Sequence, residues 1–170
     1  LSKSGEDFLL AAAVANEVEG RIGATVLLGP HNGQLWAFIH AVGTACAVAK
    51  LMGLNAAQIR HALGISLYLP PYTMMPGFMG PSSKVTTAAF PSVNGLRAAE
   101  LAAEGMTGAG RLLEDRQGFL RAFSFIPLPR MLSGWGKTWV TDSLSFKAYP
   151  GCAYVSSIAE AIRSTLREVG

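Results

Sequence analysis

Apolar residues recur every three or four positions from Gly5 to Ile22, which is the spacing of one helix face. Glu6 and Asp7 fall in the first turn, where negative charge is favourable beside the helix dipole. The pattern predicts an amphipathic helix whose buried side carries these residues: Phe8, Leu9, Ala12, Ala13, Val14, Val18 and Ile22. The following segment, GATVLLGPHNGQ, has the glycines and the proline of a loop.

Two further helices are predicted to meet across a short turn. Small and large apolar residues are mixed from Leu35 to Met52, which favours a buried, closely packed helix. Gly53 is suited to end this helix, and Asn55 is a good N-cap for the next one. We therefore expect an αα-hairpin.

The stretch from Pro70 to Ser83 contains four prolines, two glycines and two serines. So many helix breakers predict a long irregular loop, and Lys84 follows it directly. Thr86 or Thr87 can then cap a helix that reaches Gly105.

Pro91 is expected to kink that helix or to delay its start. A short helix broken at Gly118 follows. Residues of about 140–147 alternate polar and apolar side chains, which predicts a strand, and a final helix is expected at about 153–169. One strand is not stable alone, so further strands come from chain outside this sequence, or this end packs on the helical part as an appendage.

Composition narrows the class of protein. Of the 170 residues, half are hydrophobic and 15% are charged, which indicates one domain, or one domain and a piece of another, that is largely buried or covered by a partner. The net charge of +3 is scattered and no window combines basic with aromatic residues, which argues against nucleic acid as a partner. Charged or polar residues interrupt the apolar runs, which argues against a membrane span.

The two cysteines, Cys46 and Cys152, lie far apart in sequence and have no His or Cys at metal-ligand spacing. We expect reduced thiols in the cytoplasm, with neither a disulfide nor a zinc site. The first residues enter a helix without an initiator Met or a leader, which suggests a cut.

Two lysines are the strongest candidates for chemistry. Lys84 follows a loop of small and apolar residues, and Lys147 opens the segment KAYPGC. A lysine among apolar residues can bind a carboxylate or transfer a proton, because its pKa falls readily when water is withdrawn. The ordinary alternatives are a solvated loop lysine at 84 and a strand-end lysine at 147 whose ammonium reaches water.

The three histidines differ in their surroundings. His31 lies in the loop GPHNG and is the best candidate for a general acid or base, against the alternative of an ordinary turn residue. His40 lies inside an apolar helix, which favours a hydrogen-bonded core histidine. His61 is beside Arg60 on a predicted helix face and is expected to be solvated.

Five segments, taken in order, resemble the MmgE/PrpD family, which includes 2-methylcitrate dehydratase and cis-aconitate decarboxylase. Lys84 lies eleven residues before Gly95 at the spacing found in the family. The segments are GEDFLLAAAVANEVEGRI, GTACAVAKLMGLNAAQIRHALGIS, Lys84 with NGLRAAELAAEGMTG, RQGF and FKAYPGC.

The resemblance implies a mainly α fold. Residues 1–130 would form part of the family's all-helical domain, and residues 131–170 would start its small α/β lid domain, with the active site between the two. It further implies a cytoplasmic lyase that dehydrates or decarboxylates a small di- or tricarboxylate without a metal or an organic cofactor. The protein would work as a homodimer or with a complementing subunit.

The same resemblance implies the site residues. Lys84 and Lys147 match the family's lysines that bind carboxylates or transfer protons. His31, chosen above for its place in a loop, is the third catalytic candidate. Substrate-binding residues are expected around the two lysines, at Ser83, Thr87, Tyr149 and Ser156.

Three positions depart from the family pattern. Thr87 and Ser156 stand where relatives often have His, and His31 lies three residues earlier than the relatives' His, whose spacing falls on Gln34. These differences motivate two alternatives. The chain is a catalytically impaired structural or regulatory subunit, or a partial chain, of such an assembly, or it binds carboxylates without turnover.

Overall fold

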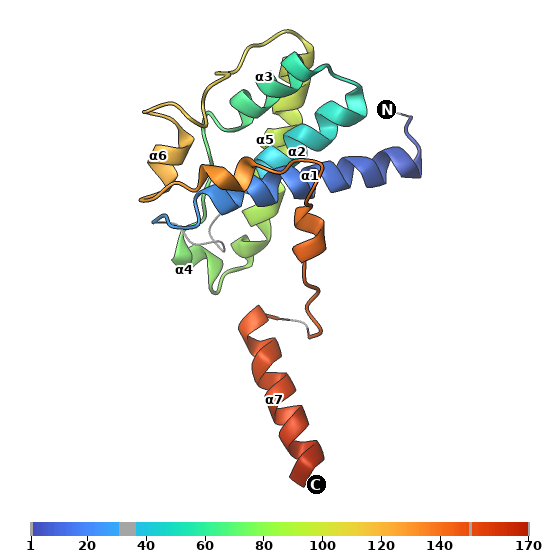
Figure 1. The fold of residues 1–170 in the computed structure, drawn as a ribbon, viewed down its shortest axis with the longest axis vertical. Coiled ribbons are helices and arrows are strands. Elements are labelled where there is room, and N and C mark those ends of the chain that lie inside the picture. The colour runs from blue at the N-terminus through green and yellow to red at the C-terminus, as the bar shows by residue number, and fades with distance from the viewer. Residues whose placement is uncertain (1, 31–36, 150, 170) are drawn as a thin grey trace.

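The computed structural model describes residues 2–30, 37–149 and 151–169, and in these ranges the regular structure is helical (Figure 1). The mainly α fold predicted from the sequence is confirmed. The helices, with 3₁₀ turns written η, are α1 (Gly5–Thr25), α2 (Ala37–Met52), α3 (Ala56–Ser66), α4 (Met75–Phe78), η2 (Ser82–Val85), α5 (Thr86–Ala103), α6 (Phe119–Phe123), η3 (Pro129–Leu132), η4 (Val140–Ser143) and α7 (Ala153–Val169). No helix in the described ranges has the length and apolar character needed to cross a membrane.

Side-chain caps fix the starts of two helices. At α1 the Ser4 hydroxyl accepts a hydrogen bond from the Asp7 N–H (3.1 Å), and the Asp7 carboxylate accepts one from the Ser4 N–H (3.0 Å). Asn55 and Gln58 form the same reciprocal pair at α3, with both bonds at 3.0 Å. Gly53 has φ +75°, the left-handed conformation in which glycine is favoured, so the predicted αα-hairpin is confirmed.

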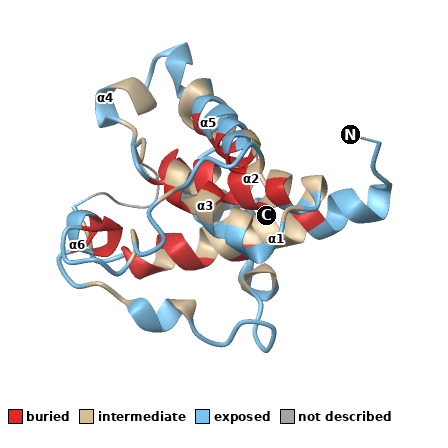
Figure 2. Cartoon of the chain, turned by 90° about the horizontal axis from the view of Figure 1, so that it is seen from above, coloured by how far each residue is buried: buried red, intermediate tan, exposed pale blue. Residues whose placement is uncertain are grey.

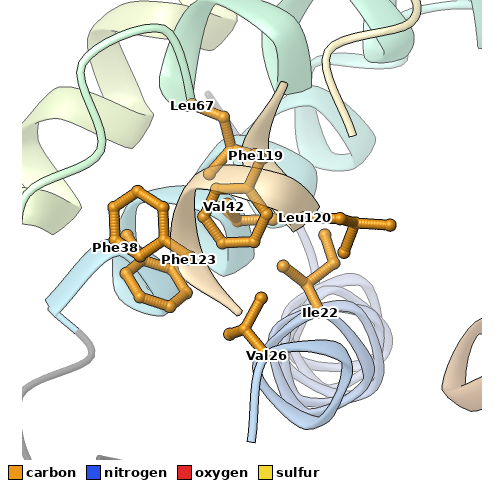
Figure 3. Packing of buried hydrophobic residues seen from close by; sticks show 8 residues of the cluster. All are labelled: Ile22, Val26, Phe38, Val42, Leu67, Phe119, Leu120 and Phe123. Atoms are coloured by element: carbon orange, nitrogen blue, oxygen red, sulfur yellow. The ribbon is translucent and has the colours of Figure 1, made fainter. Parts of the chain in front are cut away.

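The core has an aromatic part and a small-residue part. Phe38 on α2 contacts the rings of Phe119 and Phe123 edge-on, at centroid distances of 5.0 and 5.1 Å (Figure 3). Buried aliphatic residues of α1 and α2, with Leu67, complete this cluster around α6. The buried residues therefore gather along α1, α2, α3 and α5, with α6 covering one end (Figure 2).

The second cluster allows α2, α3 and α5 to pack closely. It is built from six buried alanines: Ala45, Ala49, Ala62, Ala98, Ala99 and Ala102. At Gly95 a side chain would collide with the carbonyl oxygen of Ala41 and come within 2.9 Å of the Ala45 nitrogen. Pro91 lies inside α5, and the N-cap of this helix is Val85 without a side-chain hydrogen bond, so the predicted cap at Thr86 or Thr87 is wrong. The small residues of these three helices thus set their spacing.

Residues 131–140, called the strap below, are fastened to α1 by a buried ion pair. Arg21 pairs with Glu17 one turn earlier and also donates to strap carbonyl groups, including that of Thr138 (2.6 Å). Glu17 accepts a hydrogen bond from the Val140 N–H (2.6 Å). The pair therefore satisfies its own charges and also backbone polar groups of a segment that is irregular between η3 and η4.

The strand expected at about 140–147 is not formed. Val140–Ser143 is the 3₁₀ turn η4, and residues 144–149 have no regular structure. The physical reason is the lack of a neighbour, because no strand in the described ranges can pair with this segment. The final helix lies where the sequence predicts it, and it extends away from the other helices (Figure 1). The division into two domains near residue 130 stays a prediction.

Candidate functional site

A surface hollow of about 250 Å³ lies between the loop before α4 and the start of α5. Its walls are mostly apolar, and the hydroxyl-bearing residues Ser83 and Thr87 also contribute to them. Both belong to the predicted substrate-binding set. The lining includes Ala37, Tyr72, Met74, Ser83, Thr87 and Phe90.

Lys84 lies in η2 between these two hydroxyl residues. Its Nζ is 4.3 Å from the centroid of the Phe78 ring, a cation–π distance. The side chain of Lys84 is exposed. The Ser83 hydroxyl donates to the carbonyl of Gly77 (3.2 Å) and so holds the loop against η2. The Lys84 ammonium thus has one aromatic neighbour, and the residue stays exposed to solvent.

Lys147 lies beside α7. Its Nζ donates to the carbonyl oxygen of Gly151 (2.8 Å), which closes the turn that leads into the helix. The Tyr149 hydroxyl donates to Glu160 (2.8 Å), and Arg163 donates to the other carboxylate oxygen of Glu160 (2.6 Å). The hydrogen bond to Glu160 raises the pKa of Tyr149, and the bonds from Arg163 and then Tyr149 lower the pKa of Glu160.

The Ser156 hydroxyl is shielded from solvent, and no described group forms a hydrogen bond with it. Lys147, Tyr149 and Ser156 therefore gather around the first turns of α7. His31 lies outside the described residues, so the structure does not place the third catalytic candidate.

The structure does not bring the two lysines together. The η2 turn packs beside α4 and α5, whereas η4, which precedes Lys147, packs against α1 (Figure 1). Each ammonium has a local partner, the Phe78 ring for Lys84 and the Gly151 carbonyl for Lys147.

The family model for the MmgE/PrpD N-terminal domain matches residues 1–129. The chain belongs to the MmgE/PrpD family. A comparison with curated proteins finds no match. The matched region contains α1 to α6 and therefore the hollow beside Lys84, whereas Lys147 and α7 lie after it.

In this MmgE/PrpD chain the other two histidines are half-buried against neighbouring segments. His40 is half-buried, with Nδ1 3.9 Å from a carboxylate oxygen of Glu19. His61, expected to be solvated, is instead half-buried, and its Nδ1 lies 3.3 Å from both the nitrogen and the oxygen of Gly108. The turn after α5 reaches back to α3 and covers it, which a helix-face pattern cannot show.

Sequence reasoning gave no role to the carboxylates of this MmgE/PrpD protein at Glu17 and Glu19. Glu17 carried a detectable signal, because Arg21 follows it at the i,i+4 spacing of a helical ion pair. Burial would raise the pKa of Glu17, but hydrogen bonds from Val140 and Arg21 and the charge of Arg21 outweigh it and lower the pKa. The sequence around Glu19 shows no helical ion-pair spacing, because the group nearest to its carboxylate, His40, is on another helix.

Proposed function

We propose that this MmgE/PrpD protein is a lyase that acts on a small di- or tricarboxylate, by dehydration or decarboxylation. The observation that carries the proposal is the hollow lined by Ser83, the residue before Lys84, which combines apolar walls with the hydroxyl groups of Ser83 and Thr87. A hollow of about 250 Å³ is of the size expected for a small metabolite.

The chemistry follows from charge. Loss of water or of carbon dioxide next to a carboxylate builds negative charge on the substrate, and a fixed cation lowers the barrier by stabilising that charge. In this role Lys84 binds a carboxylate at the edge of the hollow, and Ser83 and Thr87 orient the substrate by hydrogen bonds. Lys147 is the second cation that we propose for substrate binding. It reaches the hollow only when the segment that follows the strap moves toward it.

Kinetics of the full protein test this proposal. Lys84→Ala and Lys147→Ala should each lower turnover of citrate-like acids about a hundredfold or more, the loss typical of a missing acid–base group. Lys50→Ala is the matched control, because Lys50 is an exposed lysine on α2 away from the hollow, and it should leave turnover unchanged. Unchanged turnover in both site variants, for 2-methylcitrate, cis-aconitate and related acids, contradicts the mechanism.

A second candidate function is a structural or regulatory subunit that docks on a homologous chain or on its own copy. The observation in its favour is the apolar side of α7, where Ile158, Ile162 and Leu166 are all exposed. Sedimentation with and without a candidate partner distinguishes the two functions. A stable monomer would argue against the role as a structural or regulatory subunit. Citrate binding that requires Lys84 but yields no product supports a carboxylate-binding module instead.

A further inference from the structure

The chain from residue 125 to residue 140, which ends with the strap, runs along α1 in the opposite direction to the helix (Figure 1). The N–H of Leu128 donates a hydrogen bond to the carbonyl oxygen of Thr25 (2.9 Å). At the other end, the N–H of Val140 donates to the carboxylate of Glu17 (2.6 Å). The turn η4 packs on α1 as well. The strap is therefore held to α1 at its start and at its end, and Lys147 follows shortly after it.

Arg21 binds the middle of the strap. It is 6% exposed and forms five hydrogen bonds: with Glu17, with the carbonyl groups of Met131 (3.1 Å), Ser133 and Thr138 (2.6 Å), and with the Thr138 hydroxyl (3.4 Å). A guanidinium group has five N–H donors in a fixed planar arrangement. All of this donor capacity is used within the chain, so Arg21 is matched to the strap and is not available to bind an anionic ligand.

Two further contacts bring the strap close to α1. The guanidinium carbon of Arg21 lies 4.8 Å from the centroid of the Trp135 ring, a cation–π distance. Gly20 precedes Arg21 in α1, and a Cβ at Gly20 would lie 2.5 Å from Cγ1 of Val140. Because glycine has no side chain, Val140 can approach the helix backbone there. The position of the strap thus depends on shape as well as on charge.

The segment after η4 is less constrained. Residues 144–146 are exposed, and Phe146 is 99% exposed. Lys147 donates to the Gly151 carbonyl just before α7, so its hydrogen bond is local to that helix. Of the described elements, η4 is the last before Lys147, and it packs on α1. The place where the chain leaves α1 therefore limits where Lys147 can lie, because each residue of an extended chain spans only about 3.3 to 3.6 Å.

We propose that Arg21 and Glu17 are positioning residues for Lys147. They hold the strap and η4 in the place from which Lys147 reaches the hollow, and neither side chain contacts the substrate. This inference rests on the proposed function, in which Lys147 is the second cation. The position requires arginine and not only a positive charge, because lysine has its donors on one nitrogen and cannot bind the strap carbonyl groups in the same arrangement.

A double-mutant cycle tests whether Arg21 acts through Lys147. In the full protein, Arg21→Lys should lower kcat/KM for 2-methylcitrate or cis-aconitate about tenfold to a hundredfold, because a misplaced catalytic group is costly. In a Lys147→Ala background the same change should cause no further loss, whereas in a Lys84→Ala background the full loss should remain. An additional loss of the same size in the Lys147→Ala protein overturns the inference, because a merely structural Arg21 would weaken every variant equally.

The distance between two spin labels gives a second test, which does not depend on turnover. Cys152 is exposed and Cys46 is buried, so a thiol-reactive label attaches beside α7, and Glu104→Cys at the end of α5 accepts the second label. Gly20→Ala favours the helix but presses on the strap, and it should shift or broaden the distance between the labels. Gly5→Ala is the matched control, since no atom lies within 4 Å of its Cβ position, and it should leave the distance unchanged.

The two tests separate this inference from the proposed function. If Lys147→Ala does not lower turnover, the proposed function is wrong, and the labels still show whether the strap sets the place of α7. If Arg21→Lys and Gly20→Ala both leave the label distance as it is in the unmodified protein, the inference is overturned whatever the turnover. Circular dichroism of each variant checks that the helices are intact, so that a changed distance reports the strap and not unfolding.

Discussion

The helices α1 and α7 are both long and amphipathic, but they have different environments. The second half of α1 packs its apolar residues on α2 and on the aromatic cluster, and its buried charges are hydrogen-bonded to the strap, whereas Phe8 and Leu9 in the first half are exposed, contrary to the sequence prediction. On α7 the apolar side is open, and Ile162 at its centre is 56% exposed. The comparison teaches that an amphipathic pattern forms a helix, whereas its contribution to stability depends on a partner surface.

The largest effect expected from this comparison is at the buried ion pair of α1. Arg21→Ala should lower the free energy of unfolding by about 3 to 5 kcal/mol, because it leaves the Glu17 carboxylate buried without its cation and frees the strap. Urea unfolding at neutral pH measures this. Arg97→Ala removes an arginine from an exposed pair with Glu100 and should cost about 0.5 kcal/mol or less. Equal losses in the two variants would contradict the role of burial.

A smaller loss is expected where α5 crosses α2. Gly95→Ala should lower the free energy of unfolding by about 1 to 3 kcal/mol, because the added methyl group would press on the Ala41 carbonyl and separate the helices. Gly5→Ala is the matched control, since no atom lies within 4 Å of the position that its Cβ would take. Thermal unfolding of both variants checks the difference, and a Gly95→Ala protein as stable as the control would show that the helices can shift apart freely.

The smallest effect is expected on α7. Ile162→Ala should change the free energy of unfolding of this chain by about 0.5 kcal/mol or less, because the side chain is exposed and alanine favours a helix. Phe38→Ala, which removes a fully buried ring, should cost about 3 to 5 kcal/mol in the same assay. A large loss at Ile162 would mean that α7 is covered in solution, by another copy or by another part of the protein.

Much of the helical fold could be predicted from local signals. The caps at Ser4 and Asn55 and the positive φ at Gly53 depend on residues a few positions apart, so the sequence contains all of the interaction. The prediction of a strand at about 140–147 was wrong, because a strand depends on a partner that is distant in sequence. Its alternation fits a strand, but a strand also needs a neighbour, and the described residues supply none.

The candidate site divides in the same way. Ser83 and Thr87 are close in sequence, and a single turn and helix start places both at one hollow, with Lys84 between them in the chain. The approach of Lys147 to that hollow requires two segments to meet across the fold, and the structure keeps it beside α7. The contact of Glu19 with His40 was missed, because it depends on how α1 and α2 face each other.

The sequence by itself determined the helices, their caps and the family, because these depend on neighbouring residues and on the order of the motifs. Tertiary structure alone decided which charges are buried, with Arg21 and Glu17 satisfied by the strap and Glu19 left without a donor. The physical reason is that the pKa and the energy of a charge depend on distance and on water exclusion, which arise only when distant segments pack together.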